Sequence, residues 1–197
     1  MIDPLLLEAR AAFYDRAWPS REYVDYVRSN SIGPELIAGY AGATGVLPVY
    51  DCGAGRFDFD PHLHAPADPI DCFVCEALDA DGETSIDLVA WPLDHPHHVL
   101  SMFGRAPILG MWEALNPATY YMGKSLAMHR TPVDWLSAGC SGAAIVNPQL
   151  AAYLFLKIPG DIAARDQAHA RDLLRIARSV VNERRFRVAV GTNQAAA

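Results

Sequence analysis

The stretch IDCFVCEALDADGETSIDLVAW, residues 70–91, decides the fold of this chain. Two runs rich in Val, Ile, Leu and aromatic residues lie on either side of Asp81-Gly82, a pair that supplies the positive-φ positions of a tight hairpin turn. Apolar residues occupy both alternating sets of positions in these runs, which is typical of strands covered on both faces. We therefore expect a central antiparallel β-hairpin over about 70–91.

The register of this hairpin decides which of its polar groups meet. Glu76 lies opposite Asp87 if the loop has two residues, whereas Cys75 does so if the loop has three or five. Cys72 and Cys75 form a Cys-x-x-Cys pattern, but residues three apart on a strand point to opposite faces. We therefore interpret the two cysteines as buried structural thiols, not as a redox or metal site.

Helices are expected before the hairpin, over residues 1–45. Asp3 and Ser20 are suitable N-cap residues, and Pro34 suits the first position of a further helix. From Val46 the residues become typical of strands, as in VLPVYD and GRFDF, so segment 46–92 is predicted to be β-rich.

Segment 93–190 is predicted to mix strands and helices. Short strands are expected at 143–146 and 186–190, as parallel neighbours joined through two helices. Residues 191–197, GTNQAAA, offer nothing to bury and are expected to be a disordered tail.

The longest helix is predicted near the C-terminus, from an N-cap at Asp161 to about Glu183, after a shorter helix capped by Asn147. Its buried stripe follows helical spacing and consists of Ile162, His169, Leu173, Ile176 and Val180. Taken together, these elements predict one α+β domain over residues 1–197. It has a mixed sheet with the hairpin at its centre, a helical N-terminus and a long amphipathic C-terminal helix. The alternative is an α/β sandwich.

The composition is that of a globular protein. Hydrophobic residues make up 51% and charged residues 20% of the 197 residues, and no apolar run approaches the ~18–20 residues that cross a bilayer. We therefore expect no association with membranes. The lack of an export signal and of a cysteine framework indicates a cytoplasmic protein, and the excess of Arg over Lys indicates a bacterial source.

Histidines gather in segment 52–98 and define a candidate metal site. In an extended segment His62 and His64 project from the same side, so two imidazoles can converge on one ion. A third imidazole would come from DHPHH, residues 94–98, with Asp94 or Asp60 as a carboxylate ligand. The candidate ligands for a divalent metal such as zinc are therefore His62, His64, Asp94, His95, His97 and His98. The alternative is a solvent-exposed Pro-rich loop, because short His motifs often arise by chance.

The stretch AGCSGAAIV, residues 138–146, invites a nucleophile interpretation of Cys140 or Ser141. A nucleophile elbow has a strand before the turn and a helix after it. Here the predicted order is reversed, so we interpret the stretch as a helix that stops at Gly139 and a strand that follows.

The net charge of -7 is distributed unevenly, as the sum of -2 for residues 1–50, -10 for 51–94 and +5 for 95–197. The acidic middle and the basic C-terminal half can meet within the fold or between the copies of a homo-oligomer. On the long helix Arg171, Arg175 and Arg178 form a stripe suited to partner binding. The acidic total disfavours nucleic acid as that partner.

These features leave two classes of function. The preferred hypothesis is a binding or assembly domain that forms a homo-oligomer through its uneven charge. The alternative is a metal-dependent hydrolase whose ion, held by His62 and His64 with His95, His97 or His98, activates water. Nucleic-acid association through the Arg stripe ranks third. The sequence does not decide whether the protein is an enzyme.

Overall fold

The computed structural model describes residues 3–17, 19–38, 40–60 and 68–180. Helices and strands of the N-terminal part are α1 (Pro4–Arg16), α2 (Arg21–Ser29), α3 (Pro34–Ala38), β1 (Thr44–Gly53), β2 (Arg56–Asp58), β3 (Ile70–Leu78), β4 (Ser85–Pro92) and β5 (Leu100–Ser101). The C-terminal part holds β6 (Ile108–Leu109), α4 (Met111–Leu115), the 3-10 helix η2 (Pro117–Gly123), β7 (Leu126–His129), α5 (Pro132–Ser137), β8 (Ala143–Ile145), α6 (Pro148–Phe155), β9 (Ile162–Ala164) and α7 (Gln167–Arg178).

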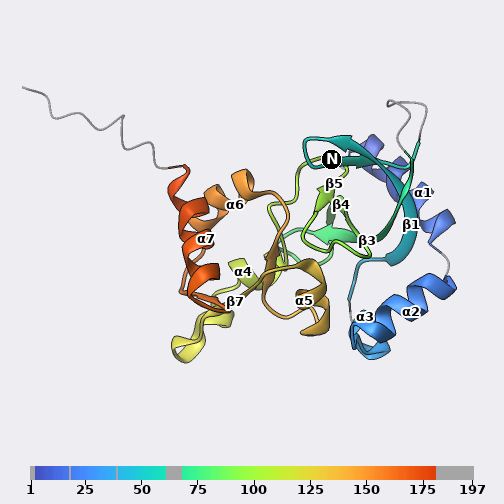
Figure 1. Ribbon diagram of the computed structural model, residues 1–197. Coiled ribbons are helices and arrows are strands. Elements are labelled where there is room, and N and C mark those ends of the chain that lie inside the picture. The colour runs from blue at the N-terminus through green and yellow to red at the C-terminus, as the bar shows by residue number, and fades with distance from the viewer. Residues whose placement is uncertain (1–2, 18, 39, 61–67, 181–197) are drawn as a thin grey trace, which may run out of the picture.

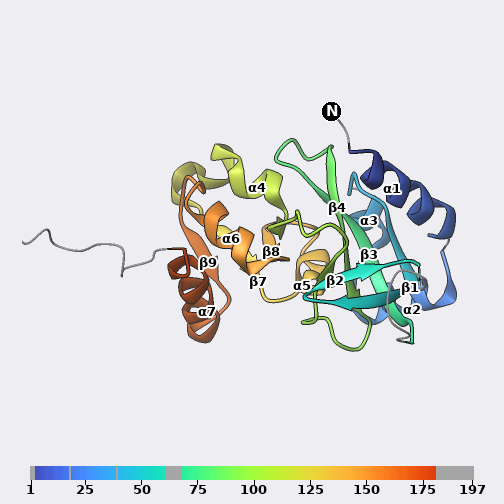
Figure 2. The same ribbon diagram turned by 90° about the horizontal axis from the view of Figure 1, so that it is seen from above.

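The strands of the described residues form two sheets, each with parallel and antiparallel pairs. One is a closed barrel of order β1-β2-β5-β4-β3, and the other is a four-stranded sheet of order β6-β8-β7-β9. The barrel with α1–α3 makes one half of the molecule, and the second sheet with α4–α7 makes the other (Figures 1 and 2). Helices combined with mixed sheets confirm the predicted α+β class. The division into two sheets was not predicted.

Three helix starts were predicted correctly from their N-cap side chains. Asp3 accepts a hydrogen bond from the Leu5 amide at 2.9 Å, and Ser20 accepts one from the Tyr23 amide at 3.1 Å. Asn147 caps α6 in the same way. Each of these side chains satisfies a backbone N–H that has no partner within the helix, so the start of the helix is determined locally.

The register of the hairpin β3–β4 differs from the registers that loops of two, three or five residues would give. Ala77 lies opposite Asp87, and Glu76 lies opposite Leu88, so the two carboxylates point to opposite faces. The reason is a register shift between Ala77 and Leu78: Leu78 pairs with Ser85 across a loop over residues 79–84, and the next pair is Ala77 with Asp87, so Ile86 is the extra residue. The predicted pairing of Asp87 with Glu76 or with Cys75 is therefore wrong.

The barrel buries apolar side chains on both of its surfaces. Its interior is filled from all five strands and closed by Phe13 of α1, with a core of Phe13, Leu47, Val49, Phe57, Phe59, Cys72, Val74, Leu88, Ala90, Leu100 and Met102. The outer surface of β3 and β4 packs against α2, α5 and the second sheet, where Trp91 and Trp135 are fully buried. Cys72 belongs to the interior core and Cys75 to the outer core, which confirms that these thiols lie on opposite faces.

The second sheet contains three parallel strands in the order β8-β7-β9, with β6 antiparallel to β8. The chain leaves β7, passes through α5 to β8 on one side, and returns through α6 to β9 on the other side. Helix α5 joins the core that it shares with the barrel, whereas α6 and α7 join a separate core. The strand order thus reverses at β7, as it does at the ligand sites of doubly wound α/β sheets.

The predicted C-terminal helix begins later than expected. Ile162–Ala164 form β9, which pairs in parallel with β7, and Asp166 caps α7 by accepting a hydrogen bond from the His169 amide at 2.9 Å. The predicted cap at Asp161 is therefore wrong, because pairing with the edge of β7 outweighs helix formation at Ile162. Residues 186–190 and 191–197, predicted as a strand and a tail, lie outside the described residues. Both edges of β8, the predicted neighbour of that strand, are occupied by β6 and β7.

A buried carboxylate joins the two halves of the molecule. Asp87 on β4 is fully buried and accepts hydrogen bonds from the Ser101 hydroxyl at 2.6 Å and from the Phe103 and Arg105 amides at 2.8 and 2.7 Å. The amide of Ala106 donates to it as well, at 3.1 Å. These donors lie on β5 and on the connection to β6, so Asp87 determines how the chain leaves the barrel.

We expect Asp87→Asn to lower the free energy of unfolding by about 2–4 kcal/mol, because an amide NH₂ would face backbone N–H groups that need an acceptor. Urea unfolding of the variant and the parent protein measures the difference. Asp71→Asn, at an exposed position of the neighbouring strand, is the matched control and should change stability by less than about 0.5 kcal/mol. Equal stability of the two variants would contradict the assigned role of Asp87.

Candidate functional site

Polar side chains gather beside a cavity at the carboxyl ends of the parallel strands. In open sheets of this kind ligands bind beyond the carboxyl ends of the strands, where the strand order reverses. His129 and Arg130 come at the end of β7, and Arg165 and Asp166 directly follow β9. A cavity of about 520 Å³ opens at this edge, towards the loop that leaves the barrel after β4.

Four histidines from both halves of the molecule line this cavity, which we call the histidine cavity. His97 and His98 come from the loop after β4, His129 from the end of β7, and His169 from the first turn of α7. Its apolar wall consists of Val99, Ile145, Val146, Leu173 and Ile176. Arg130 and Asp172 add charged groups, so the cavity combines an apolar wall with several polar side chains.

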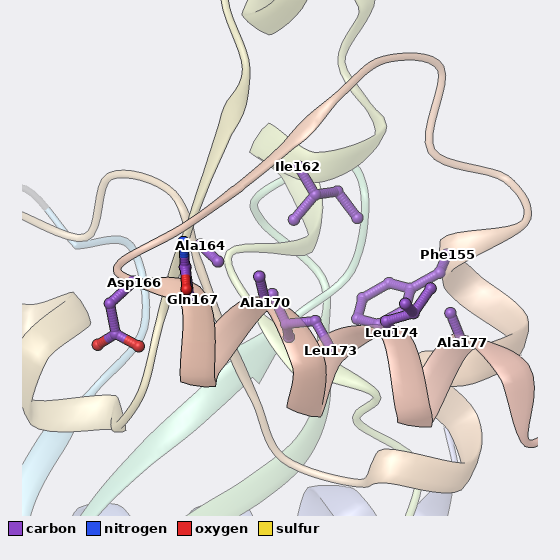
Figure 3. A pocket seen from close by; sticks show the side chains of 9 residues that line it. All are labelled: Phe155, Ile162, Ala164, Asp166, Gln167, Ala170, Leu173, Leu174 and Ala177. Atoms are coloured by element: carbon purple, nitrogen blue, oxygen red, sulfur yellow. The ribbon is translucent and has the colours of Figure 1, made fainter.

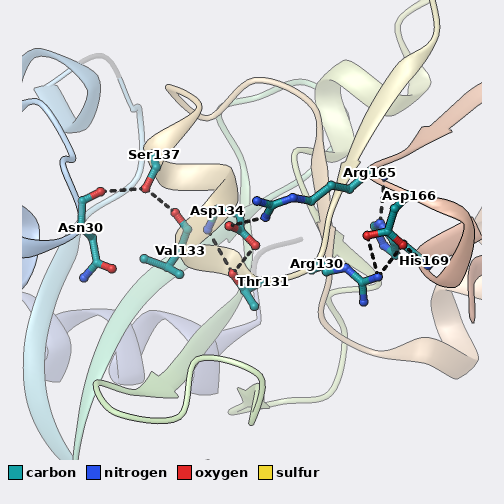
Figure 4. Close-up of polar contacts among 9 residues, drawn as sticks. All are labelled: Asn30, Arg130, Thr131, Val133, Asp134, Ser137, Arg165, Asp166 and His169. Atoms are coloured by element: carbon teal, nitrogen blue, oxygen red, sulfur yellow. Dashed lines mark hydrogen bonds and ion pairs between the residues drawn. The ribbon is translucent and has the colours of Figure 1, made fainter.

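Ion pairs connect the polar side chains that follow β7 and β9 at this edge of the sheet (Figure 4). One terminal nitrogen of Arg130, Nη2, donates to both carboxylate oxygens of Asp166, at 2.8 and 3.0 Å. The hydrogen bond from the His169 amide, together with Arg130, lowers the pKa of Asp166. Asp166 therefore stays ionised and links the end of β7 to the start of α7.

A second ion pair ties β9 to α5. Arg165 donates to the Asp134 carboxylate at 3.3 Å, and the Thr131 hydroxyl donates to the other oxygen of that carboxylate at 2.8 Å. Thr131 is also the N-cap of α5. The first turns of α5 and α7 are thus each held to a neighbouring strand by a carboxylate and an arginine (Figure 4).

His169 was predicted on the buried stripe of the C-terminal helix, and one of its two ring nitrogens has a hydrogen-bond partner among the described residues. It is buried, at 5% exposure, and its Nδ1 accepts a hydrogen bond from the Arg165 amide at 3.3 Å. Burial, followed by the charge of Arg130, lowers the pKa of His169, so the ring is neutral at neutral pH and carries its proton on Nε2. Among the described residues no group accepts a hydrogen bond from Nε2.

Two of the other histidines are oriented by hydrogen bonds. His129 donates from Nε2 to the Ser141 carbonyl at 2.9 Å, since a carbonyl can only accept. The Nε2 of His98 lies 2.9 Å from the Asp51 carboxylate on β1. These contacts hold each ring against its own half of the molecule.

The predicted metal ligands are brought together only in part. His97 and His98 line the histidine cavity, whereas Asp94 and His95 are exposed and pair with each other at 2.9 Å. His62 and His64 lie outside the described residues. Within the described ranges no group of three or more His, Cys, Asp or Glu side chains is placed to hold a metal ion. The metal site therefore stays a prediction.

Metal analysis of protein purified without a His tag tests this prediction. If the site exists, the parent protein contains close to one equivalent of zinc, manganese or iron, and the His62→Ala/His64→Ala double variant loses it. The control is His129→Ala, which removes a histidine outside the predicted ligand set and should retain the metal. Metal-free parent protein, with a melting temperature unchanged by chelator and by the double substitution, would contradict it.

Cys140 lies in a turn but is not an activated nucleophile. It follows Gly139 at the end of α5 and has a positive φ of 58°, in line with the predicted helix stop. Burial raises its pKa to about 12, so the thiolate is scarce at neutral pH. Ser141 lies next to it and donates to Glu113 at 3.3 Å, an acceptor that orients the turn before β8.

Arg171, Arg175 and Arg178 form the predicted stripe and are exposed on α7. Arg175 pairs with Asp172 at 3.0 Å. Beside the stripe lies a second hollow of about 550 Å³, the apolar groove, lined by Phe155, Ile162, Ala164, Asp166, Gln167, Ala170, Leu173, Leu174 and Ala177. Phe155 extends from α6 toward Leu174 on α7 (Figure 3).

Comparisons with protein-family models, with curated proteins and with solved structures gave no match. In the part of the chain that the structure describes, no helix has both the length and the apolar character needed to cross a membrane. The geometry of the described residues is therefore the basis on which a function can be proposed.

Proposed function

We propose that this chain is a binding domain that takes a small molecule in the histidine cavity. The observation that carries the proposal is the Nε2 proton of His169, a donor on a buried side chain that lines the cavity and has no acceptor among the described residues. Nε2 is not one of the solvent-inaccessible polar atoms without a partner among the described residues, so it faces the cavity and can donate to a ligand acceptor in place of water. The cavity volume is also within the ~300–1,000 Å³ typical of small-molecule sites.

The lining suits recognition of a small molecule. It consists of an apolar wall and of polar groups that converge from the barrel loop, β7 and α7. Such a combination orients a ligand by a few hydrogen bonds while its apolar part is buried.

A fragment screen observed through the histidine side chains tests this proposal. We expect fragments that bind to shift the ¹H–¹⁵N ring signals of His97, His129 and His169 together, because the three rings line one cavity. The ring of His95, which is exposed and outside the cavity, is the internal control and should not move. Fragments from a library of acids, bases and neutral heterocycles that leave all cavity rings unshifted at millimolar concentration would contradict the proposal.

A specific observation favours self-assembly as a second function. Next to the apolar groove the side chain of Leu174 is 48% exposed, and Tyr153 and Leu156 of the neighbouring α6 region are exposed too. The basic stripe on the same helix complements exposed acidic residues on the barrel, including Asp71, Asp81, Glu83 and Asp94. This charge complementarity supports a second copy of this chain as the partner that covers the exposed apolar residues around the groove.

Light scattering across a range of protein concentrations and salt checks for this oligomer. We expect Leu174→Glu to shift the protein to the monomer, because a carboxylate would be buried in the apolar contact. Leu7→Glu, at a leucine of α1 that is 45% exposed, is the matched control and should leave the oligomer intact. A parent protein that stays monomeric at all concentrations and salt levels would contradict self-assembly.

A further inference from the structure

The geometry points to a small molecule bearing an oxyanion, a phosphate or a carboxylate, as the ligand of the histidine cavity. This inference rests on the proposed binding function and names the chemical class of its ligand. Two features support it: the N–H donors that line the cavity, and the partners that the nearby carboxylates already have.

Arg130 has hydrogen-bonding capacity that its ion pair does not use. A guanidinium offers five N–H donors on three nitrogens. Both contacts with Asp166 come from the same nitrogen, Nη2. The donors on Nε and Nη1 have no acceptor among the described residues, and Arg130 lines the cavity. Arg130 can therefore hold Asp166 and a ligand oxyanion at the same time.

His169 supplies a second donor at the same edge without adding a charge. Its Nδ1 is held by the Arg165 amide, so the neutral ring presents Nε2–H. Asp166 connects the two donors, since it accepts from the guanidinium of Arg130 and from the backbone amide of His169. One carboxylate thus orients both the cation and the neutral donor, an arrangement that suits an acceptor with more than one oxygen.

The carboxylates near the cavity each have a partner, and that of Asp51 lies 2.9 Å from Nε2 of His98. Asp172, the acidic lining residue, pairs with Arg175 on the outer side of α7, and Asp166 pairs with Arg130. Arg130 is the permanently charged cation among the described lining residues, and four histidines surround the remaining volume. The apolar wall of Val99, Ile145 and Leu173 is then left for the organic part of the ligand.

Titration calorimetry with three probes that share one ring tests this inference. The probes are phenyl phosphate, benzoate and phenol, which carry a phosphate, a carboxylate and a neutral hydroxyl. We expect at least one anionic probe to bind about tenfold tighter than phenol, and the tighter of the two identifies the phosphate or the carboxylate as the head group. Phenol binding as tightly as both anions would overturn the inference.

Arg130→Gln should remove this preference, so that the anionic probe loses about tenfold in affinity while phenol is unaffected. Arg130→Lys retains a positive charge beside Asp166 but lacks the planar set of N–H donors of a guanidinium, so an intermediate loss of affinity is expected. Arg165→Gln is the matched control, because Arg165 is at the same edge but pairs with Asp134 outside the cavity. Thermal unfolding of each variant shows whether a loss of binding comes from a loss of fold.

The outcome for Arg130 separates this inference from the proposed function. If fragments shift the cavity histidines but Arg130→Gln leaves the affinity of both anions unchanged in a folded protein, the oxyanion inference fails and the binding function stands. If neither fragments nor the three probes shift these histidines, both fail.

Discussion

The buried carboxylate of Asp87 is the interaction on which the arrangement of the two halves depends. It lies on the outer surface of β4 and accepts hydrogen bonds from β5 and from the connection that leads to β6. A fully buried carboxylate needs such donors, because removal of its charge from water costs several kcal/mol. Since these donors lie at successive positions of one connection, their geometry directs the chain out of the barrel and towards the second sheet.

The histidine cavity exists only because the two halves are held in this way. His97 and His98 belong to the loop that follows β4, the strand that carries Asp87, whereas His129 and His169 belong to the second sheet and its last helix. Neither half contains the cavity by itself. The aromatic core around Trp91 and Trp135 fills the rest of the contact between the halves, so the cavity is a gap at the edge of a packed interface.

The ion pairs at the carboxyl edge serve orientation more than stability. The Arg130 and Asp166 side chains are 31% and 50% exposed, and an ion pair at that exposure contributes little to stability because water screens it. The pair instead determines how the Arg130 side chain is oriented. It holds the guanidinium at the end of β7 and orders the first turn of α7, where His169 is buried. The polar groups at this edge thus orient the residues of the site, although they contribute little to folding stability.

The sequence by itself determined the helix starts at Asp3, Ser20 and Asn147, the strands of the hairpin and the opposite faces of Cys72 and Cys75, because each depends on neighbouring residues. Only the tertiary structure decided the register of Glu76 and Asp87, the strand at Ile162–Ala164 and the meeting of His169 with His97. Strands of two to four residues, such as β6 and β9, are too short to show periodicity, and they form because a partner strand offers hydrogen bonds. The cavity is likewise lined by residues more than 70 positions apart, such as His97 and His169, which local chemistry cannot bring together.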